Sequence, residues 1–120
     1  MASLLHVLVV EDEPLVRDVI VDALDGVYRT SHADTAAGAI DCLRGGDVDA
    51  MLLDCTLPGG LDPALVQLAD QSRVPVILMS GHPDAMDRVP GAGRLAIQKP
   101  FSLTALLDTI ERAVASTRVA

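Results

Sequence analysis

Aromatic side chains are nearly absent from this 120-residue sequence, which has one Phe, one Tyr and no Trp. Half of the residues are nevertheless hydrophobic, so we expect a folded chain whose core is built from Val, Leu, Ile, Ala and Met. Nine Lys and Arg residues stand against 17 Asp and Glu residues, which gives a formal net charge of -8. This excess of acid argues against direct binding to nucleic acid through its phosphates and against binding to an anionic membrane surface.

Cysteines and long apolar runs are also few. Cys42 and Cys55 have neither the spacing of metal ligands nor that of a disulfide framework, so we expect free thiols in a reducing cytosol. The first apolar run is interrupted by His6 and stops at Glu11, unlike a signal peptide, and no run approaches the roughly 20 residues that span a bilayer. The length fits a single domain, residues 1–120, and the composition predicts a soluble, cytoplasmic protein.

Short apolar runs that end on polar side chains are the main pattern of the sequence. Residues 51–53 are apolar and are followed by Asp54, which is typical of a strand buried on both faces of a parallel sheet. Other apolar runs end just before Glu11, at Ser80 and close to Lys99. The predicted strands are residues 4–10, 27–33, 48–54, 75–80 and 94–98. The second of them, residues 27–33, is more polar and is expected near an edge of the sheet.

Apolar residues at helical spacing lie between these strands. Pro14 suits the first turn of one helix, Asp34 or Thr35 can cap a second, and Ser102 can cap the last. A helix at residues 84–89 is expected to be short at best, because Pro and Gly follow it. The apolar stripes of the other helices, interpreted as core, are Leu15, Val16, Val19, Ile20, Ala23 and Leu24; Ala36, Ile40 and Leu43; Leu61, Leu65, Leu68 and Ala69; and Leu103, Leu106, Leu107, Ile110, Ala113 and Val114.

Five strands alternating with five helices predict an α/β fold, a doubly wound five-stranded parallel sheet with helices on both faces. Ligands bind at the carboxyl ends of such strands, where Glu11, Asp12, Asp54, Ser80 and Lys99 would meet. Crowded carboxylates are costly unless a proton or a cation intervenes, and oxygen ligands favour Mg²⁺. A carboxylate beside Mg²⁺, an ammonium and a hydroxyl suits phosphoryl transfer, with the carboxylate as a possible nucleophile.

Five short motifs follow one another along the chain: VLVVEDE (residues 7–13), LLD (52–54), LPG (57–59), MSG (79–81) and KPF (99–101). In order and approximate spacing, this set resembles the CheY-like receiver domain of response regulators in two-component signalling. The resemblance covers nearly the whole chain and implies the flavodoxin-like strand order 2-1-3-4-5.

The resemblance also implies functional roles. Asp54 would accept a phosphoryl group from a phosphohistidine on a sensor histidine kinase or a histidine phosphotransfer protein. Asp12 and Asp54 would bind Mg²⁺, Glu11 would act mostly through a metal-bound water, and the backbone carbonyl of Thr56 would complete the protein ligands.

Lys99 would pair with Asp54 and then with the phosphoryl oxygens, and Ser80 would donate a hydrogen bond to the phosphoryl group. The resemblance further implies a cis peptide between Lys99 and Pro100. One position departs from the family pattern: Ala96 stands three residues before the lysine, where Tyr or Phe is usual, so the aromatic half of the switch is missing.

We therefore expect a phosphorelay switch that catalyses only its own phosphorylation and dephosphorylation, a monomer or weak dimer with an atypical, mobile face at residues 84–93. The sequence predicts no DNA-binding or enzymatic output domain. Two alternatives stay open. Ala96 gives some support to a degenerate receiver that docks proteins without phosphorylation. A hydrolase would need a general acid near Asp54 and a cap over its substrate, yet Thr56 lies two residues after Asp54 and no cap insertion is present.

Overall fold

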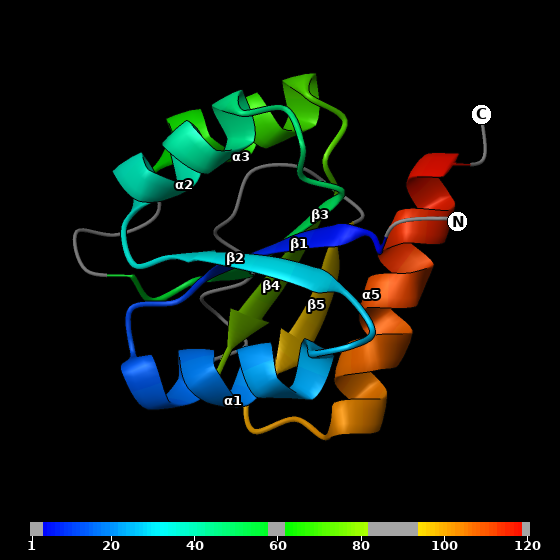
Figure 1. Cartoon of the computed structure of the whole chain (residues 1–120). Coiled ribbons are helices and arrows are strands. Elements are labelled where there is room, and N and C mark those ends of the chain that lie inside the picture. Colours follow the sequence, from blue (N-terminus) through cyan, green and yellow to red (C-terminus); the bar gives the residue numbers. More distant parts are fainter. Residues whose placement is uncertain (1–3, 58–61, 82–93, 119–120) are drawn as a thin grey trace.

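Five parallel strands form the central sheet (Figure 1). The computed structural model describes residues 4–57, 62–81 and 94–118. The strand order is β2-β1-β3-β4-β5, and each neighbouring pair is parallel, which confirms the expected flavodoxin-like fold. The strands are β1 (His6–Val10), β2 (Arg29–Ala33), β3 (Ala50–Asp54), β4 (Val76–Ser80) and β5 (Leu95–Gln98).

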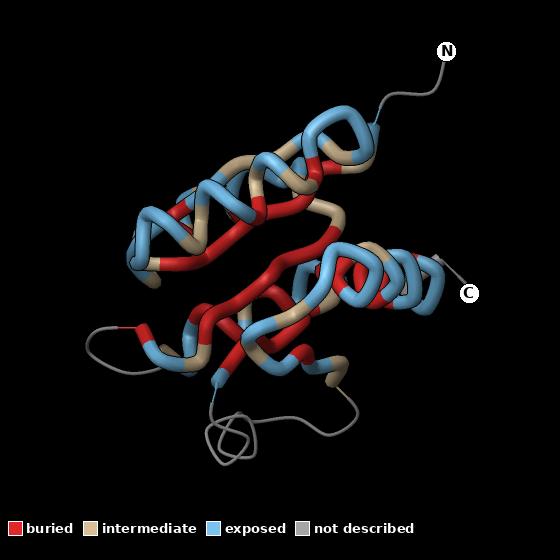
Figure 2. Tube along the Cα trace, turned by 90° about the horizontal axis from the view of Figure 1, so that it is seen from below, coloured by how far each residue is buried: buried red, intermediate tan, exposed pale blue. Residues whose placement is uncertain are grey.

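Helices cover both faces of this sheet. α2 and α3 lie on one face, and α1 and α5 lie on the other (Figures 1 and 2). The described residues contain four helices, and both the expected short helix at residues 84–89 and the mobile face expected at residues 84–93 lie outside them. The helices are α1 (Pro14–Leu24), α2 (Ala36–Arg44), α3 (Pro63–Gln71) and α5 (Leu103–Arg118).

Within the described ranges, no helix has both the length and the apolar character needed to cross a membrane.

The three central strands, β1, β3 and β4, are buried along their whole length. Their side chains alternate between two apolar clusters, so that Leu53 packs with residues of α2 and α3, whereas Leu52 packs with residues of α1 and α5. A strand covered on both faces has no room for a charge in its middle. Asp54, the last residue of β3, accordingly lies at the strand end.

Polar side chains fix the starts of the helices. Thr35 Oγ1 accepts a hydrogen bond from the backbone N–H of Gly38 at 3.1 Å, which decides between Asp34 and Thr35 as the cap of α2. Ser102 Oγ accepts a hydrogen bond from the backbone N–H of Ala105 at 3.1 Å, as predicted for the last helix. Each such cap contributes about 1 kcal/mol to helix stability.

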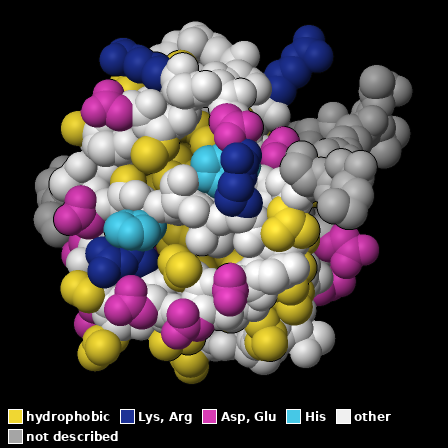
Figure 3. Space-filling model, in the orientation of Figure 1, with side chains coloured by type: hydrophobic (Ala, Val, Ile, Leu, Met, Phe, Trp, Pro, Cys, Tyr) yellow, Lys and Arg dark blue, Asp and Glu magenta, His cyan; other side chains and the backbone are white. Residues whose placement is uncertain are grey.

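Three apolar residues that we expected in the core lie on the surface. Leu15 and Val19 of α1 are 78% and 67% exposed, and Leu103 of α5 is 51% exposed. Hydrophobic side chains protrude along the lower edge of the molecule in Figure 3, where α1 runs. The prediction was wrong for these residues, because helical spacing identifies one side of a helix but not how far neighbouring elements cover that side. The fully buried residues of α1 are Ile20 and Leu24.

A polar network around the buried His6 joins neighbouring segments at the amino-terminal end of the strands. His6 Nδ1 lies 2.9 Å from the carbonyl oxygen of Asp47 and is the donor in this hydrogen bond, since a carbonyl only accepts. Nε2 lies 2.7 Å from Ser31 Oγ, and the backbone N–H of His6 donates to the carboxylate of Asp49 at 2.8 Å. These bonds join β1, β2 and the segment before β3 at the end of the sheet that lies away from Asp54.

Candidate functional site

The carboxyl ends of β1 and β3 bring three carboxylates together. The two strands are neighbours, with Val10 paired to Leu53, so Glu11 and Asp54 leave the sheet side by side. One ligand oxygen from each of Glu11, Asp12 and Asp54 lies within 4.8 Å of the other two. Glu11 and Asp54 are each 1% exposed, whereas Asp12 is half-buried. The structure thus gathers three residues that the sequence predicted for one site.

The crowding of acids has an electrostatic cost. Burial raises the pKa of Glu11 above its ordinary value, and the charge of Asp54 acts in the same direction, while the hydrogen bond from Lys99 opposes both. Two buried carboxylates next to a third need positive charge to remain ionised together.

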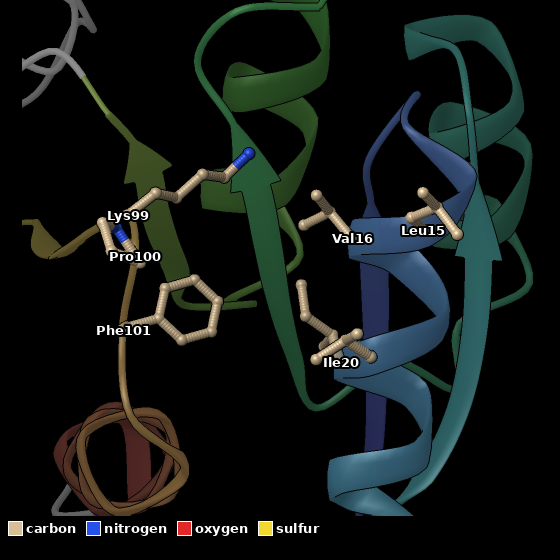
Figure 4. A pocket seen from close by; sticks show the side chains of 7 residues that line it. Leu15, Val16, Ile20, Lys99, Pro100 and Phe101 are labelled. Carbon is tan, nitrogen blue, oxygen red and sulfur yellow. The ribbon is translucent and has the colours of Figure 1, made fainter.

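Lys99 supplies part of that charge. Its Nζ donates a hydrogen bond to Glu11 Oε2 at 2.7 Å and lies 3.5 Å from Asp54 Oδ1. Burial alone would lower the pKa of Lys99, but the hydrogen bond to Glu11 and the charge of Asp54 outweigh it, and the pKa is raised. The side chain extends toward the carboxyl end of β3 (Figure 4). Its backbone N–H donates to the carbonyl of Ser80 at 2.9 Å, and the peptide between Lys99 and Pro100 is cis, as the resemblance implied.

Asp54 has a further partner that the sequence did not reveal. Its Oδ1 accepts one hydrogen bond from the backbone N–H of Thr56 at 3.1 Å and a second from the Thr56 hydroxyl at 2.9 Å. Thr56 itself is exposed. The resemblance implied a role for its backbone carbonyl only, and the hydroxyl two residues after Asp54 was the available signal for this contact.

Ser80 and Cys55 complete the immediate surroundings. Ser80 is fully buried at the end of β4, and β4 pairs with β3 so that Met79 lies opposite Asp54. Burial, followed by the charge of Asp54, raises the pKa of Cys55 to about 11, so this residue stays a neutral thiol near pH 7. Cys42 and Cys55 are both free, as expected.

The chemistry of the donors fits a hard divalent cation. The clustered groups are carboxylate oxygens, two of the three side chains are buried, and no nitrogen or sulfur ligand shares the cluster within the described part of the chain. Mg²⁺ prefers such oxygen ligands and is often bound through one or two carboxylates. Asp12, Asp54 and Glu11 are the side chains that could hold it.

The model of the response regulator receiver domain matches residues 7–111. The chain belongs to this family. Receiver domains of this kind bind Mg²⁺ and work in two-component systems, where they interact with histidine kinases or phosphotransfer proteins.

Relatives of this receiver domain include transcriptional regulators. It is 38% identical over 117 residues to the transcriptional regulatory protein CseB of Streptomyces coelicolor, a match that covers 92% of this chain and 49% of that protein. It is 32% identical over 112 residues to the TorCAD operon transcriptional regulatory protein TorR of Escherichia coli K12, covering 88% of this chain and 48% of the relative. The chain thus spans about half the length of these curated relatives.

Solved receiver structures have the same fold. The chemotaxis protein CheY4 of Vibrio cholerae superimposes with a TM-score of 0.80 at 22% identity, covering 92% of this chain and 99% of that chain. NtrX from Brucella abortus superimposes with a TM-score of 0.80 at 29% identity, covering 98% of this chain and 28% of that chain.

One position of this receiver domain departs from the usual pattern. Ala96 is an exposed residue of β5, paired with Leu78 of β4, at the position where Tyr or Phe is usual. A methyl group cannot act as a rotating aromatic ring, so the aromatic half of the switch that the resemblance implied has no suitable side chain here.

An apolar groove lies beside the carboxylates of the receiver domain. It has a volume of about 450 Å³, and Phe101 faces Ile20 across it (Figure 4). The groove was not predicted from the sequence. The available signal was the density of apolar residues in the first half of α1, which exceeds what one helix face needs for burial. The lining residues are Leu15, Val16, Val19, Ile20, Lys99, Pro100 and Phe101.

Proposed function

We propose that this receiver domain, residues 1–120, accepts a phosphoryl group on Asp54 from a phosphohistidine donor in a Mg²⁺-dependent reaction. The phosphorylated form then changes its interactions with partner proteins. One observation carries the proposal: the Asp54 carboxylate is 1% exposed, has Lys99 Nζ 3.5 Å from Oδ1, and shares a 4.8 Å cluster with two other acids. An Asp that served only as a turn or helix cap would not need a half-buried ammonium and two more carboxylates beside it.

Asp54 is the nucleophile in this proposal. One of its carboxylate oxygens forms a bond to phosphorus as the phosphorus–nitrogen bond of the phosphohistidine breaks, and the electron pair of that bond returns to the imidazole nitrogen. The product is an aspartyl phosphate, and no group is oxidised or reduced. Attack of water on phosphorus later restores the carboxylate, so the protein acts only on itself.

Three acids and one carbonyl are the proposed metal ligands. Asp12 and Asp54 would bind Mg²⁺ directly, Glu11 mostly through a metal-bound water, and Thr56 through its backbone carbonyl. When bound, the ion neutralises negative charge on the transferred phosphoryl group.

Lys99 and Ser80 would stabilise the phosphoryl group from the protein side. The Lys99 ammonium is already close to Asp54 and can leave Glu11 to pair with a phosphoryl oxygen, which also carries negative charge. Ser80 lies at the end of the strand next to β3, from which a hydroxyl can donate to the phosphoryl group. The position of both groups follows from the parallel register of the sheet.

The apolar groove supports a protein as the donor. Lys99 lines the groove and also contacts the acidic cluster, so a protein seated in the groove lies next to Asp54. Leu15 and Val19 offer exposed apolar side chains at this place. We expect a histidine kinase or a histidine phosphotransfer protein to cover them while it presents its phosphohistidine.

The test is the intact mass of the protein after incubation with acetyl phosphate, with and without Mg²⁺. Wild type should gain the mass of one phosphoryl group only when Mg²⁺ is present, and Asp54→Asn should gain none. Beryllofluoride, a noncovalent phosphoryl mimic, is tested in parallel by calorimetry. A wild type that neither gains the adduct nor binds beryllofluoride contradicts the proposal and leaves a docking module that works without phosphorylation.

A further inference from the structure

The two oxygens of the Asp54 carboxylate have different surroundings. Oδ1 accepts from the Thr56 N–H at 3.1 Å and from the Thr56 hydroxyl at 2.9 Å, and Lys99 Nζ lies 3.5 Å from the same oxygen. The contact with the backbone N–H is an ordinary turn interaction of Asp with the residue two positions later. The hydroxyl contact is not needed for that turn, and it is a second donor from the same residue.

We propose that the Thr56 hydroxyl is a positioning group that restrains the resting Asp54 carboxylate and slows its phosphorylation. This inference rests on the proposed function of Asp54 as phosphoacceptor. It assigns the hydroxyl a role separate from that of the Thr56 carbonyl, which is the proposed metal ligand.

The physical basis is a difference between the resting state and the transition state. A hydrogen bond to a carboxylate is strengthened by the full negative charge of the acceptor. When either oxygen of Asp54 bonds to phosphorus, the carboxylate loses that charge and becomes a mixed anhydride, so Oδ1 becomes a weaker acceptor. The hydroxyl therefore stabilises the resting carboxylate more than the transition state, which raises the barrier.

The size of the effect is limited by the exposure of Thr56. An exposed hydroxyl that loses its partner can donate to water instead, so releasing Oδ1 costs less than breaking a buried hydrogen bond. Removing the hydroxyl should therefore raise the phosphorylation rate by about three- to tenfold. The backbone N–H contact and Lys99 would still hold the carboxylate in place.

The experiment compares wild type with Thr56→Val, Thr56→Ser and Thr104→Val. Val keeps the branched shape of Thr without the hydroxyl, Ser keeps the hydroxyl, and Thr104 is an exposed residue of α5 outside the site. Initial rates of phosphoryl gain are measured by intact mass at several concentrations of acetyl phosphate and a saturating concentration of Mg²⁺. In this step the phosphoryl group moves from acetyl phosphate to Asp54, and acetate leaves with the electron pair.

We expect Thr56→Val to raise the maximal rate, Thr56→Ser to stay closer to wild type, and Thr104→Val to have no effect. The Mg²⁺ dissociation constant, measured by calorimetry, should be unchanged in Thr56→Val, because the hydroxyl is not a proposed ligand. If Thr56→Val does not fold, Thr56→Ala should accelerate the reaction in the same direction.

Three results would overturn the inference. Thr56→Val could be no faster than wild type, Thr56→Ser could be as fast as Thr56→Val, or the gain in rate could come entirely from tighter Mg²⁺ binding. A slower Thr56→Val would mean that the hydroxyl moves to a phosphoryl oxygen and assists the reaction. A wild type that gains no phosphoryl group is a failure of the proposed function itself, and it is recognised before any variant is compared.

Discussion

Lys99 Nζ lies 2.7 Å from Glu11 Oε2, closer than the 3.5 Å that separates it from Asp54 Oδ1. The two buried carboxylates thus contact the same ammonium, and Glu11 makes the shorter contact. Because the Glu11 side chain is 1% exposed and that of Lys99 is 22% exposed, water contributes little to the solvation of Glu11. When no metal ion is bound, the negative charge of an ionised Glu11 is therefore stabilised mainly by Lys99.

Replacing Lys99 by Met should lower the free energy of unfolding by about 2 to 3 kcal/mol, since a buried carboxylate loses its charged partner. Urea unfolding followed by circular dichroism measures this, a suitable probe because the protein has no Trp. The control is Arg112→Met on α5, whose pair with Asp108 is 3.9 Å long and well exposed and should cost at most about 0.5 kcal/mol. Equal stability of Lys99→Met and wild type would show that Glu11 is compensated in another way.

Asp12→Asn should weaken Mg²⁺ binding by about tenfold or more, because an amide oxygen carries no charge to replace the carboxylate of a proposed direct ligand. Calorimetry gives the dissociation constant. Glu13→Gln is the matched control: Glu13 is an exposed acid next to Asp12, outside the clustered oxygens. Similar losses of affinity in both variants would indicate a general effect of negative charge rather than coordination by Asp12.

The pair between Asp70 of α3 and Arg94, the residue before β5, should make a pH-dependent contribution to stability. Nη1 and Nη2 of Arg94 donate to the two carboxylate oxygens of Asp70, at 2.9 and 2.7 Å, and this bonding lowers the pKa of Asp70. Because the pKa of Asp70 is lower in the folded state, the ion pair stabilises the folded protein fully at pH values above the ordinary Asp pKa of about 3.9. This stabilisation disappears as the pH falls through the pKa that Asp70 has in the folded protein.

Asp70→Asn should therefore destabilise the protein near neutral pH by at most about 1 kcal/mol, a small value because the Asp70 side chain is 52% exposed. The difference from wild type should shrink in urea unfolding curves recorded from about pH 7 down to about pH 3. Asp41→Asn, at an exposed site on α2, controls for the loss of one negative charge. A difference that stays constant over this range would rule out the ion pair as its cause.

A substitution in the groove should slow phosphoryl transfer from a protein donor but not from a small donor such as acetyl phosphate. Leu15→Ser removes an exposed apolar side chain, so it should reduce phosphoryl transfer from a phosphorylated histidine phosphotransfer domain by about tenfold. Its rate with acetyl phosphate should match wild type. Leu103→Ser, which removes an exposed apolar residue outside the groove, is the control for both assays. An equal loss with both donors would mean that Leu15 supports the site and not the docking of a donor.

Much of the fold could be predicted because the central strands obey a simple rule. A strand such as β3, with both faces covered, must be apolar up to its end, so its polar terminus marks the functional edge. The starts of the strands follow no such rule, and β1 and β3 each begin two residues later than predicted. Residues 27–33 were likewise predicted as a strand, yet β2 begins at Arg29, because the backbone N–H groups of Val27 and Tyr28 donate to the carbonyl of Leu24 at the end of α1.

The contacts within the site were less accessible to sequence reasoning. Topology brings Glu11, Asp54 and Lys99 to one edge, but which carboxylate takes the ammonium depends on side-chain reach and rotamer. The Thr56 hydroxyl is a similar case, since a Thr two residues after an Asp has several side-chain conformations. Exposure of Leu15 depends on the width of the gap between α1 and the segment before α5, which no local pattern encodes.

Cys55 has a consequence for the redox behaviour of the site. It follows the proposed acceptor directly in the chain, and only a thiolate, not a neutral thiol, is a good nucleophile. The pKa of about 11 keeps the proton on the sulfur. The same protonation makes the thiol slow to react with oxidants, so we expect Cys55 to stay reduced beside the proposed acceptor.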